Sequence, residues 1–157
     1  FQTDYWNYRM FKSICDNMHK EPSPGTLGIL TDPEHPLFED FPTDFHTDWQ
    51  WYAIVKNSYP LILDAMPEGF RPTVQVIDNI ERNHRLGLLF EATVGRGKLL
   101  VCMADLPEVR QFMRSILRYM SSVDFKPDTE MSPQQLQEIF HTQGNDQIEA
   151  LHNISYD

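Results

Sequence analysis

Apolar and polar residues follow two different periods along the chain, and these periods predict its elements. Segments in which apolar side chains recur every three or four residues predict amphipathic helices. We expect one helix from Asp4 to about Lys20, a second over Asp48–Asn57, a third that begins near Asp105 and extends to Met120, and a fourth that begins at Ser132. The expected N-cap residues of these helices are Asp4, Asp48, Asp105 and Ser132. Gln135 completes a capping box with Ser132.

Shorter apolar runs predict strands. Thr26–Thr31 and Leu61–Asp64 are short and largely apolar, which favours burial on both faces, whereas Thr73–Ile77 alternates and should keep one wetter face. Leu86–Val94 and Lys98–Met103 flank a Gly-Arg-Gly turn and predict a β-hairpin. Strands interleaved with helices predict an α/β fold of three layers, with a mostly parallel central sheet and the hairpin at one edge.

The third predicted helix has two distinct faces. Its expected core face consists of Val109, Phe112, Met113, Ile116, Leu117 and Met120. Arg110, Arg114 and Arg118 follow one another at four-residue spacing on another side. We interpret this row as a solvated face, although it could also meet an acidic partner or a domain interface.

Length and charge limit the classes of function. The chain has 157 residues, 41% of them hydrophobic, which suits one globular domain; we divide it into an α/β domain over 1–128 and a C-terminal helix with a loose tail over 129–157. The net charge of −10 argues against binding to nucleic acid or to an anionic membrane surface. No run of 18 apolar residues occurs. Neutral and cationic partners therefore remain open.

The residues that could carry catalysis all have simpler roles. Asp64, Asp78 and Asp105 follow predicted strands and could form an acid–base pair, but capping and turn roles are favoured. The candidate metal ligands, His35, Asp44, His46 and Asp48, lie in an acidic loop where Asp48 is already expected to cap a helix. We therefore expect no metal, no cofactor and no catalytic residue in this chain.

Cysteine and glycine give no catalytic signature either. Cys15 and Cys102 stand in apolar surroundings and are interpreted as two buried free thiols, with a disulfide as the less favoured alternative. Cys102 lies within a predicted strand and lacks the strand-to-helix turn of a nucleophile elbow. The Gly95–Gly97 turn lacks the spacing of a phosphate-binding loop.

Aromatic residues are concentrated in the first half of the chain. Of the nineteen, thirteen lie between Phe1 and Phe70. Trp49, Trp51 and Tyr52 form the candidate ligand site, because aromatic rings can stack on sugar rings. On a helix Trp49 and Tyr52 share a face while Trp51 points elsewhere, so packing in a core or between domains is the simpler reading for part of this cluster.

Several blocks of sequence together resemble one family. The blocks are TDYWNYRMF (3–11), SPGTLGIL (23–30), HPLFEDFPTDFHTDWQW (35–51) and the GRGKLLVC hairpin. They resemble the C-terminal region of large family 2 glycoside hydrolases, of the kind found in Bacteroides-type gut bacteria. The resemblance covers about Phe1 to Phe125. The same region is similar in plan to class I glutamine amidotransferase-like domains and to the trimerisation domain of some β-galactosidases, which implies a flavodoxin-like sheet.

The resemblance implies a role without chemistry of its own. The glycosidase carboxylates of that family belong to a barrel domain, and the Cys-His-Glu site of true amidotransferases has no counterpart here, so no catalytic residue is carried over. It implies a non-catalytic accessory domain of a β-galactosidase-like enzyme in carbohydrate degradation. Such a domain would be structural, oligomeric or glycan-contacting, and would have the enzyme's other domains, a carbohydrate or a second copy as partners. A periplasmic or cell-envelope location is implied in the same way.

Two alternatives stay open at this stage. One is a free-standing hydrolase of amidotransferase-like fold with a degenerate site, and the other is a protein–protein interaction module. The resemblance also leads us to expect that the chain begins inside its domain, because a flavodoxin-like domain should open with a strand and a helix before TDYWN.

Overall fold

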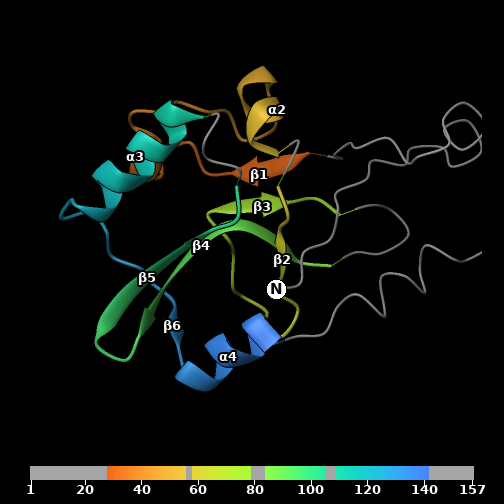
Figure 1. Ribbon diagram of the computed structural model, residues 1–157, viewed down its shortest axis with the longest axis vertical. Coiled ribbons are helices and arrows are strands. Elements are labelled where there is room, and N and C mark those ends of the chain that lie inside the picture. The colour runs from red at the N-terminus through yellow and green to blue at the C-terminus, as the bar shows by residue number, and fades with distance from the viewer. Residues whose placement is uncertain (1–27, 56–57, 79–83, 105–108, 142–157) are drawn as a thin grey trace, which may run out of the picture.

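The computed structural model describes residues 28–55, 58–78, 84–104 and 109–141. The predicted helix from Asp4 to about Lys20, together with Cys15, lies outside these ranges. Within them the chain is an α/β domain with a six-stranded sheet and three α-helices, as the sequence predicts at that level. Figure 1 shows the sheet as a twisted middle layer, with α2 and α3 on one side and α4 on the other.

Strand β4 (Leu86–Val94) is the centre of the sheet and pairs with four other strands. Its first residues pair with β2 (Leu61–Ile62) along one edge and with β3 (Val74–Val76) along the other. Further along, β5 (Gly97–Cys102) continues the first edge and β6 (Glu130–Met131) the second. Strand β1 (Ile29–Thr31) pairs with β3 and closes that side of the sheet.

The expectation of a mostly parallel sheet is wrong. Every pairing is antiparallel except the two-residue contact between β4 and β6. The connection from β3 to β4 spans only residues 77–85, which is too short for the crossover that parallel neighbours require. The apolar runs suggested parallel strands because helices cover both faces of the sheet at β4, so this central strand is almost continuously buried, as the strands of parallel sheets are. The flavodoxin-like relationship stays a prediction, which the antiparallel pairing does not support.

The two faces of the sheet bury separate cores. Under η1 (Pro36–Phe38), α2 (Trp49–Val55) and α3 (Arg110–Met120), the core includes Phe38, Trp51 and Phe112 together with Val74 and Leu89 of the sheet. Under α4 (Pro133–His141), Phe90 and Ala92 pack with Ile139 and with residues of the 61–70 segment. Helices α2 and α4 and the hairpin β4–β5 appear close to where the apolar periodicity predicts them.

A bulge in β4 turns neighbouring side chains toward different cores. Val74 pairs with Leu89 but the next residue, Gln75, pairs with Gly87, so Leu88 is the extra residue. As a result Leu88 and Leu89 both join the core under α2 and α3, and Phe90 joins the core under α4. A Cβ added at Gly87 would clash with Leu63 Cδ1, so a larger residue here would force the buried Leu63 side chain to shift.

Two expectations about burial need correction. Strand β1 is not buried on both faces, because the side chain of Leu30 is 46% exposed. On α3 the buried residues are Phe112, Ser115, Ile116 and Tyr119, whereas the predicted core residues Met113, Leu117 and Met120 are exposed. The small side chain of Ser115, whose hydroxyl donates to the Leu37 carbonyl, lets η1 approach α3 closely and turns the buried face toward that side.

Candidate functional site

The three aromatic residues predicted as a ligand site separate into one core residue and two surface residues. Trp51 is fully buried, so no glycan can reach its ring, and this part of the prediction is corrected. Trp49 is 86% exposed and Tyr52 is 54% exposed. Their ring centroids lie 5.9 Å apart with an interplanar angle of 63°, so the two rings form an edge-to-face pair on the outer side of α2.

Trp51 holds this pair in place. Its indole Nε1 donates to Thr43 Oγ1 over 2.7 Å, and its ring makes edge contacts with Phe41 and Phe112, with centroids 5.4 and 5.3 Å away. At the start of the helix, the backbone N–H of Gln50 donates to Asp48 Oδ1 over 2.9 Å, as the predicted cap requires. The buried side of α2 therefore fixes the orientation of the exposed aromatic pair.

The predicted carboxylates meet around His84 instead of facing a substrate. Asp64 Oδ2 lies 2.6 Å from His84 Nδ1, and Asp64 Oδ1 accepts from the Arg85 backbone N–H over 2.7 Å. Asp78 is buried and its Oδ2 accepts from the His84 backbone N–H over 2.9 Å. Backbone groups thus bind both carboxylates and tie β4 to the segments before it, which is the turn role favoured from the sequence. Asp105 lies outside the described residues.

The candidate metal ligands do not come together. His35 Nδ1 accepts from the Leu37 backbone N–H over 3.3 Å, and His46 Nδ1 lies 3.0 Å from the Thr47 carbonyl oxygen. Asp48 caps α2. In the described ranges no group of three or more His, Cys, Asp or Glu side chains is arranged to hold a metal ion.

Cys102 is a free thiol at the end of β5, half-buried. Burial raises the pKa of the Cys102 thiol, and a hydrogen bond with the backbone of Ala104 offsets only part of that effect. A nucleophilic cysteine needs the opposite shift, because the thiolate is the reactive form. The environment of Cys102 is therefore that of a structural cysteine.

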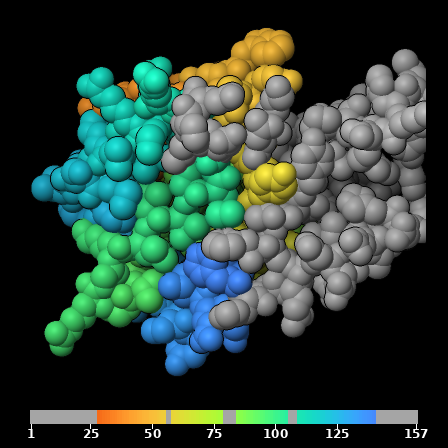
Figure 2. Space-filling view, viewed as in Figure 1, coloured from red at the N-terminus to blue at the C-terminus, as the bar shows by residue number. Residues whose placement is uncertain are grey.

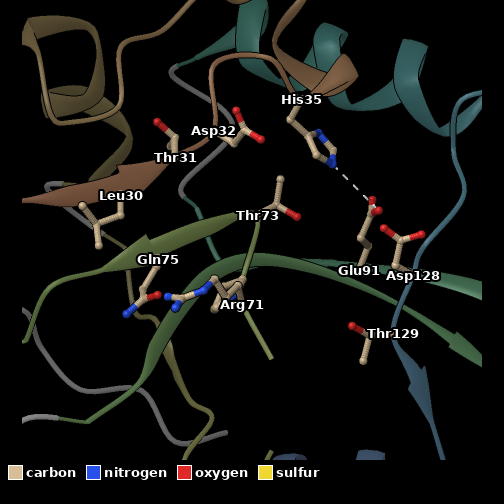
Figure 3. Close-up of a pocket in the computed structure, with 11 residues that line it drawn as sticks. Leu30, Thr31, Asp32, His35, Arg71, Thr73, Gln75, Glu91, Asp128 and Thr129 are labelled. Carbon is tan, nitrogen blue, oxygen red and sulfur yellow. Dashed lines mark ion pairs between the residues drawn. The ribbon is translucent and has the colours of Figure 1, made fainter. Parts of the chain in front are cut away.

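A polar pocket of about 350 Å³, which the sequence did not predict, lies between the sheet and the loops around it. Figure 3 shows His35 and Glu91 facing each other, with Asp128 beside Glu91 and with Arg71 and Gln75 on the far side of Thr73. His35 Nε2 lies 3.9 Å from Glu91 Oε1. The signal was present in the sequence, since Glu91 is the one charged residue in the apolar run of β4.

Tyr119 stabilises the charge of Glu91 from the buried side. Its hydroxyl donates to Glu91 Oε1 over 3.0 Å, while Glu91 Oε2 is buried and has no hydrogen-bond partner in the described part of the chain. Burial raises the pKa of Tyr119, and the hydrogen bond and charge of Glu91 raise it further, so the phenol stays protonated. The pocket offers donors and acceptors for a small polar molecule, but none of its lining residues is a cysteine or a serine.

The described part of the molecule is thus an α/β domain with an exposed aromatic pair and a polar pocket, and without an assembled nucleophile or metal centre. The chain belongs to the family described as "Domain of unknown function (DUF8487)", whose model matches residues 1–141. No curated protein matches the chain. Among the described residues, no helix is long and apolar enough to cross a membrane.

Proposed function

We propose that this chain is a non-catalytic accessory domain of a larger, β-galactosidase-like glycoside hydrolase, and that Trp49 and Tyr52 contact the glycan. The observation that carries the proposal is the exposed edge-to-face pair on α2, with Trp49 86% and Tyr52 54% exposed. Large aromatic side chains this exposed are a feature of binding surfaces. The finer relationship to flavodoxin-like and glutamine amidotransferase-like domains, and a cell-envelope location, belong to the same proposal.

The rigidity of α2 supports a binding role for the pair. Because Trp51 packs among Phe41, Phe112 and Thr43, the backbone of α2 that carries Trp49 and Tyr52 is anchored to the core. An anchored helix loses little backbone entropy when a ligand binds to its outer side. A sugar ring could then pack its C–H face against one aromatic ring while its hydroxyl groups remain in water.

The hydrogen bonds of the candidate carboxylates and the pKa of the cysteine also favour a role without catalysis. Asp64 and Asp78 are engaged by the backbone around His84, and the raised pKa of Cys102 works against a thiolate nucleophile. A retaining glycosidase needs two carboxyl groups placed on either side of the scissile bond. We assign that chemistry to another domain of the parent enzyme.

The experiment is a fluorescence titration of the 157-residue chain with galactosides and plant oligosaccharides, comparing wild type with Trp49→Ala and Tyr52→Ala. We expect saturable binding in wild type and a loss of about tenfold or more in each variant, as hot-spot truncations give. Leu117→Ala, on the exposed side of α3, is the matched control and should bind like wild type. Trp51→Phe should lower stability but, when folded, keep binding.

An unchanged affinity in Trp49→Ala and Tyr52→Ala would remove the aromatic pair from the proposal. A wild-type chain that binds none of the sugars would leave a purely structural or oligomeric role. The two results are distinguishable because the first still yields a binding curve.

A further inference from the structure

Helix α3 has an apolar surface about twice as wide as the part the fold buries. Phe112, Ser115, Ile116 and Tyr119 face the core. Met113, Leu117 and Met120 are 43, 56 and 41% exposed. Their spacing of four and then three residues places the three side chains in one stripe along the helix. We call these three residues the α3 stripe.

The α3 stripe lies on the side of the helix away from η1. The η1 side is held by the Ser115 hydroxyl on the Leu37 carbonyl and by Gln111 Nε2, which donates to the Asp40 carbonyl over 3.0 Å. Those contacts lie on the opposite side of α3, and Met113, Leu117 and Met120 stay partly exposed. Val123, 79% exposed, follows just beyond the end of the helix. Figure 2 shows α3 at the surface of the molecule, at the upper left of the view.

The charges beside the α3 stripe have one sign. Helix α3 carries Arg110, Arg114 and Arg118 and no acidic residue, in a chain with a net charge of −10. At 100° per residue, Arg110 and Arg114 lie next to Leu117, on the side of the stripe that faces away from the core. Neither guanidinium has an ion-pair partner among the described residues, whereas Arg118 Nε pairs with Asp40 Oδ2 at 2.7 Å. Arg118 thus has the carboxylate partners that Arg110 and Arg114 lack among the described residues.

We propose that the α3 stripe and the two unpaired arginines together form a docking site for an acidic amphipathic protein segment. Its apolar side chains would cover Met113, Leu117 and Met120, and its carboxylates would pair with Arg110 and Arg114 as Asp40 and Glu39 pair with Arg118. Burial of the α3 stripe supplies affinity. Arg110 and Arg114 at its border fix the orientation of the partner and select a partner of negative charge. The site is separate from α2 and does not depend on the glycan contact.

A second copy of this chain is a poorer occupant. Two copies meeting through α3 would bring Arg110 and Arg114 of each toward a surface with the same charges, and the chains would also repel through their net charge of −10 each. Charge complementarity therefore favours a different polypeptide, with carboxylates bordering an apolar face.

The test uses a synthetic helical peptide with leucines at i, i+4 and i+7 bordered by glutamates, titrated into the full chain by fluorescence anisotropy. We expect saturable binding that weakens about tenfold in Leu117→Gln, as loss of an interface anchor does. Arg114→Gln should weaken binding and reduce its dependence on salt concentration. Arg96→Gln, in the hairpin turn, is the matched charge control and should have no effect.

Three results would overturn the proposal. One is that a peptide with every glutamate replaced by lysine binds as tightly as the glutamate peptide. The arginines would then not select for negative charge in the partner. Another is an affinity unchanged in Leu117→Gln whose circular dichroism matches wild type. The third is concentration-dependent self-association of the chain, measured by sedimentation, that Leu117→Gln abolishes, since the occupant would then be a second copy.

Discussion

Glu91 places a negative charge inside an otherwise apolar strand, and Tyr119 is the residue that makes this tolerable. A buried carboxylate is costly unless it accepts hydrogen bonds, and the Tyr119 hydroxyl donates one over 3.0 Å. Burial raises the pKa of Tyr119, and the hydrogen bond and charge of Glu91 raise it further, so the phenol is held in its neutral form. The pair connects α3 to β4 through the wall of the polar pocket.

Replacing Tyr119 with Phe should destabilise the domain by about 2 kcal/mol, because it removes a hydrogen bond to a charged group and leaves Glu91 without a donor. The folded-state pKa of Tyr119 lies above that of an unfolded tyrosine, near 10. Its contribution to stability is therefore complete below about pH 10 and is lost as pH rises through the folded-state pKa.

Urea unfolding at several alkaline pH values measures this effect. Above about pH 10 the free energy of unfolding should fall more steeply in wild type than in Tyr119→Phe. The double variant Tyr119→Phe/Glu91→Gln is the control, since its loss of stability should be smaller than that of Tyr119→Phe alone. Parallel pH curves for wild type and Tyr119→Phe would show that the hydrogen bond is not formed in solution.

The thiol of Cys102 should react slowly with iodoacetamide at neutral pH, because burial raises its pKa and limits access. The measurement is the alkylation rate in a Cys15→Ser variant, where Cys102 is the remaining cysteine. Unfolding in urea should raise the rate strongly. Fast alkylation of the folded protein would instead favour the alternative of a free-standing hydrolase with a reactive cysteine.

At the scale of elements, the sequence predicted structure best where residues close together in the chain form each other's backbone hydrogen bonds or turns. The capping box of α4 is present, with Ser132 N–H donating to Gln135 Oε1 over 2.9 Å and Gln135 N–H donating to Ser132 Oγ over 3.1 Å. The hairpin β4–β5 turns at Gly95, whose φ of 61° suits glycine. Both features depend on residues close together in sequence, which is why the sequence alone was sufficient.

Features that depend on distant segments were predicted poorly. The pairing direction of β3 and β4 and the exposed stripe of α3 both follow from which element packs against which. Apolar periodicity says that a face is apolar but not what covers it. The pocket was missed for the same reason, because His35 and Glu91 meet only after η1 has packed on the sheet.

The close approach of β4 to Leu63 yields a direct test of the sheet. Gly87→Ala should lower stability by about 1 to 3 kcal/mol, because its Cβ would clash with the fully buried side chain of Leu63, which would have to shift. Gly69→Ala is the matched control, since a Cβ there meets nothing within 4 Å. Thermal unfolding of both variants measures the difference. Equal melting temperatures for the two would show that the core under α4 is looser than described.

At the scale of the whole molecule, the domain is a platform with different surfaces on different elements. The twisted sheet lies between α2 and α3 on one side and α4 on the other (Figure 1). Helix α2 carries the exposed aromatic pair, and α3 carries the apolar stripe with its arginines. No described element brings together the groups of a hydrolytic site. The central claim of the proposed function, a domain that binds a glycan for a neighbouring catalytic domain, rests on the exposed aromatic pair of α2.

The measurement that tests this claim most directly is a calorimetric titration of the unmodified chain with a galacto-oligosaccharide. We predict measurable heat and a saturable isotherm that disappears in Trp49→Ala while Leu117→Ala retains it. Absence of heat with galactosides, or an isotherm that Trp49→Ala leaves unchanged, would contradict the assignment of α2 as the glycan-contacting surface.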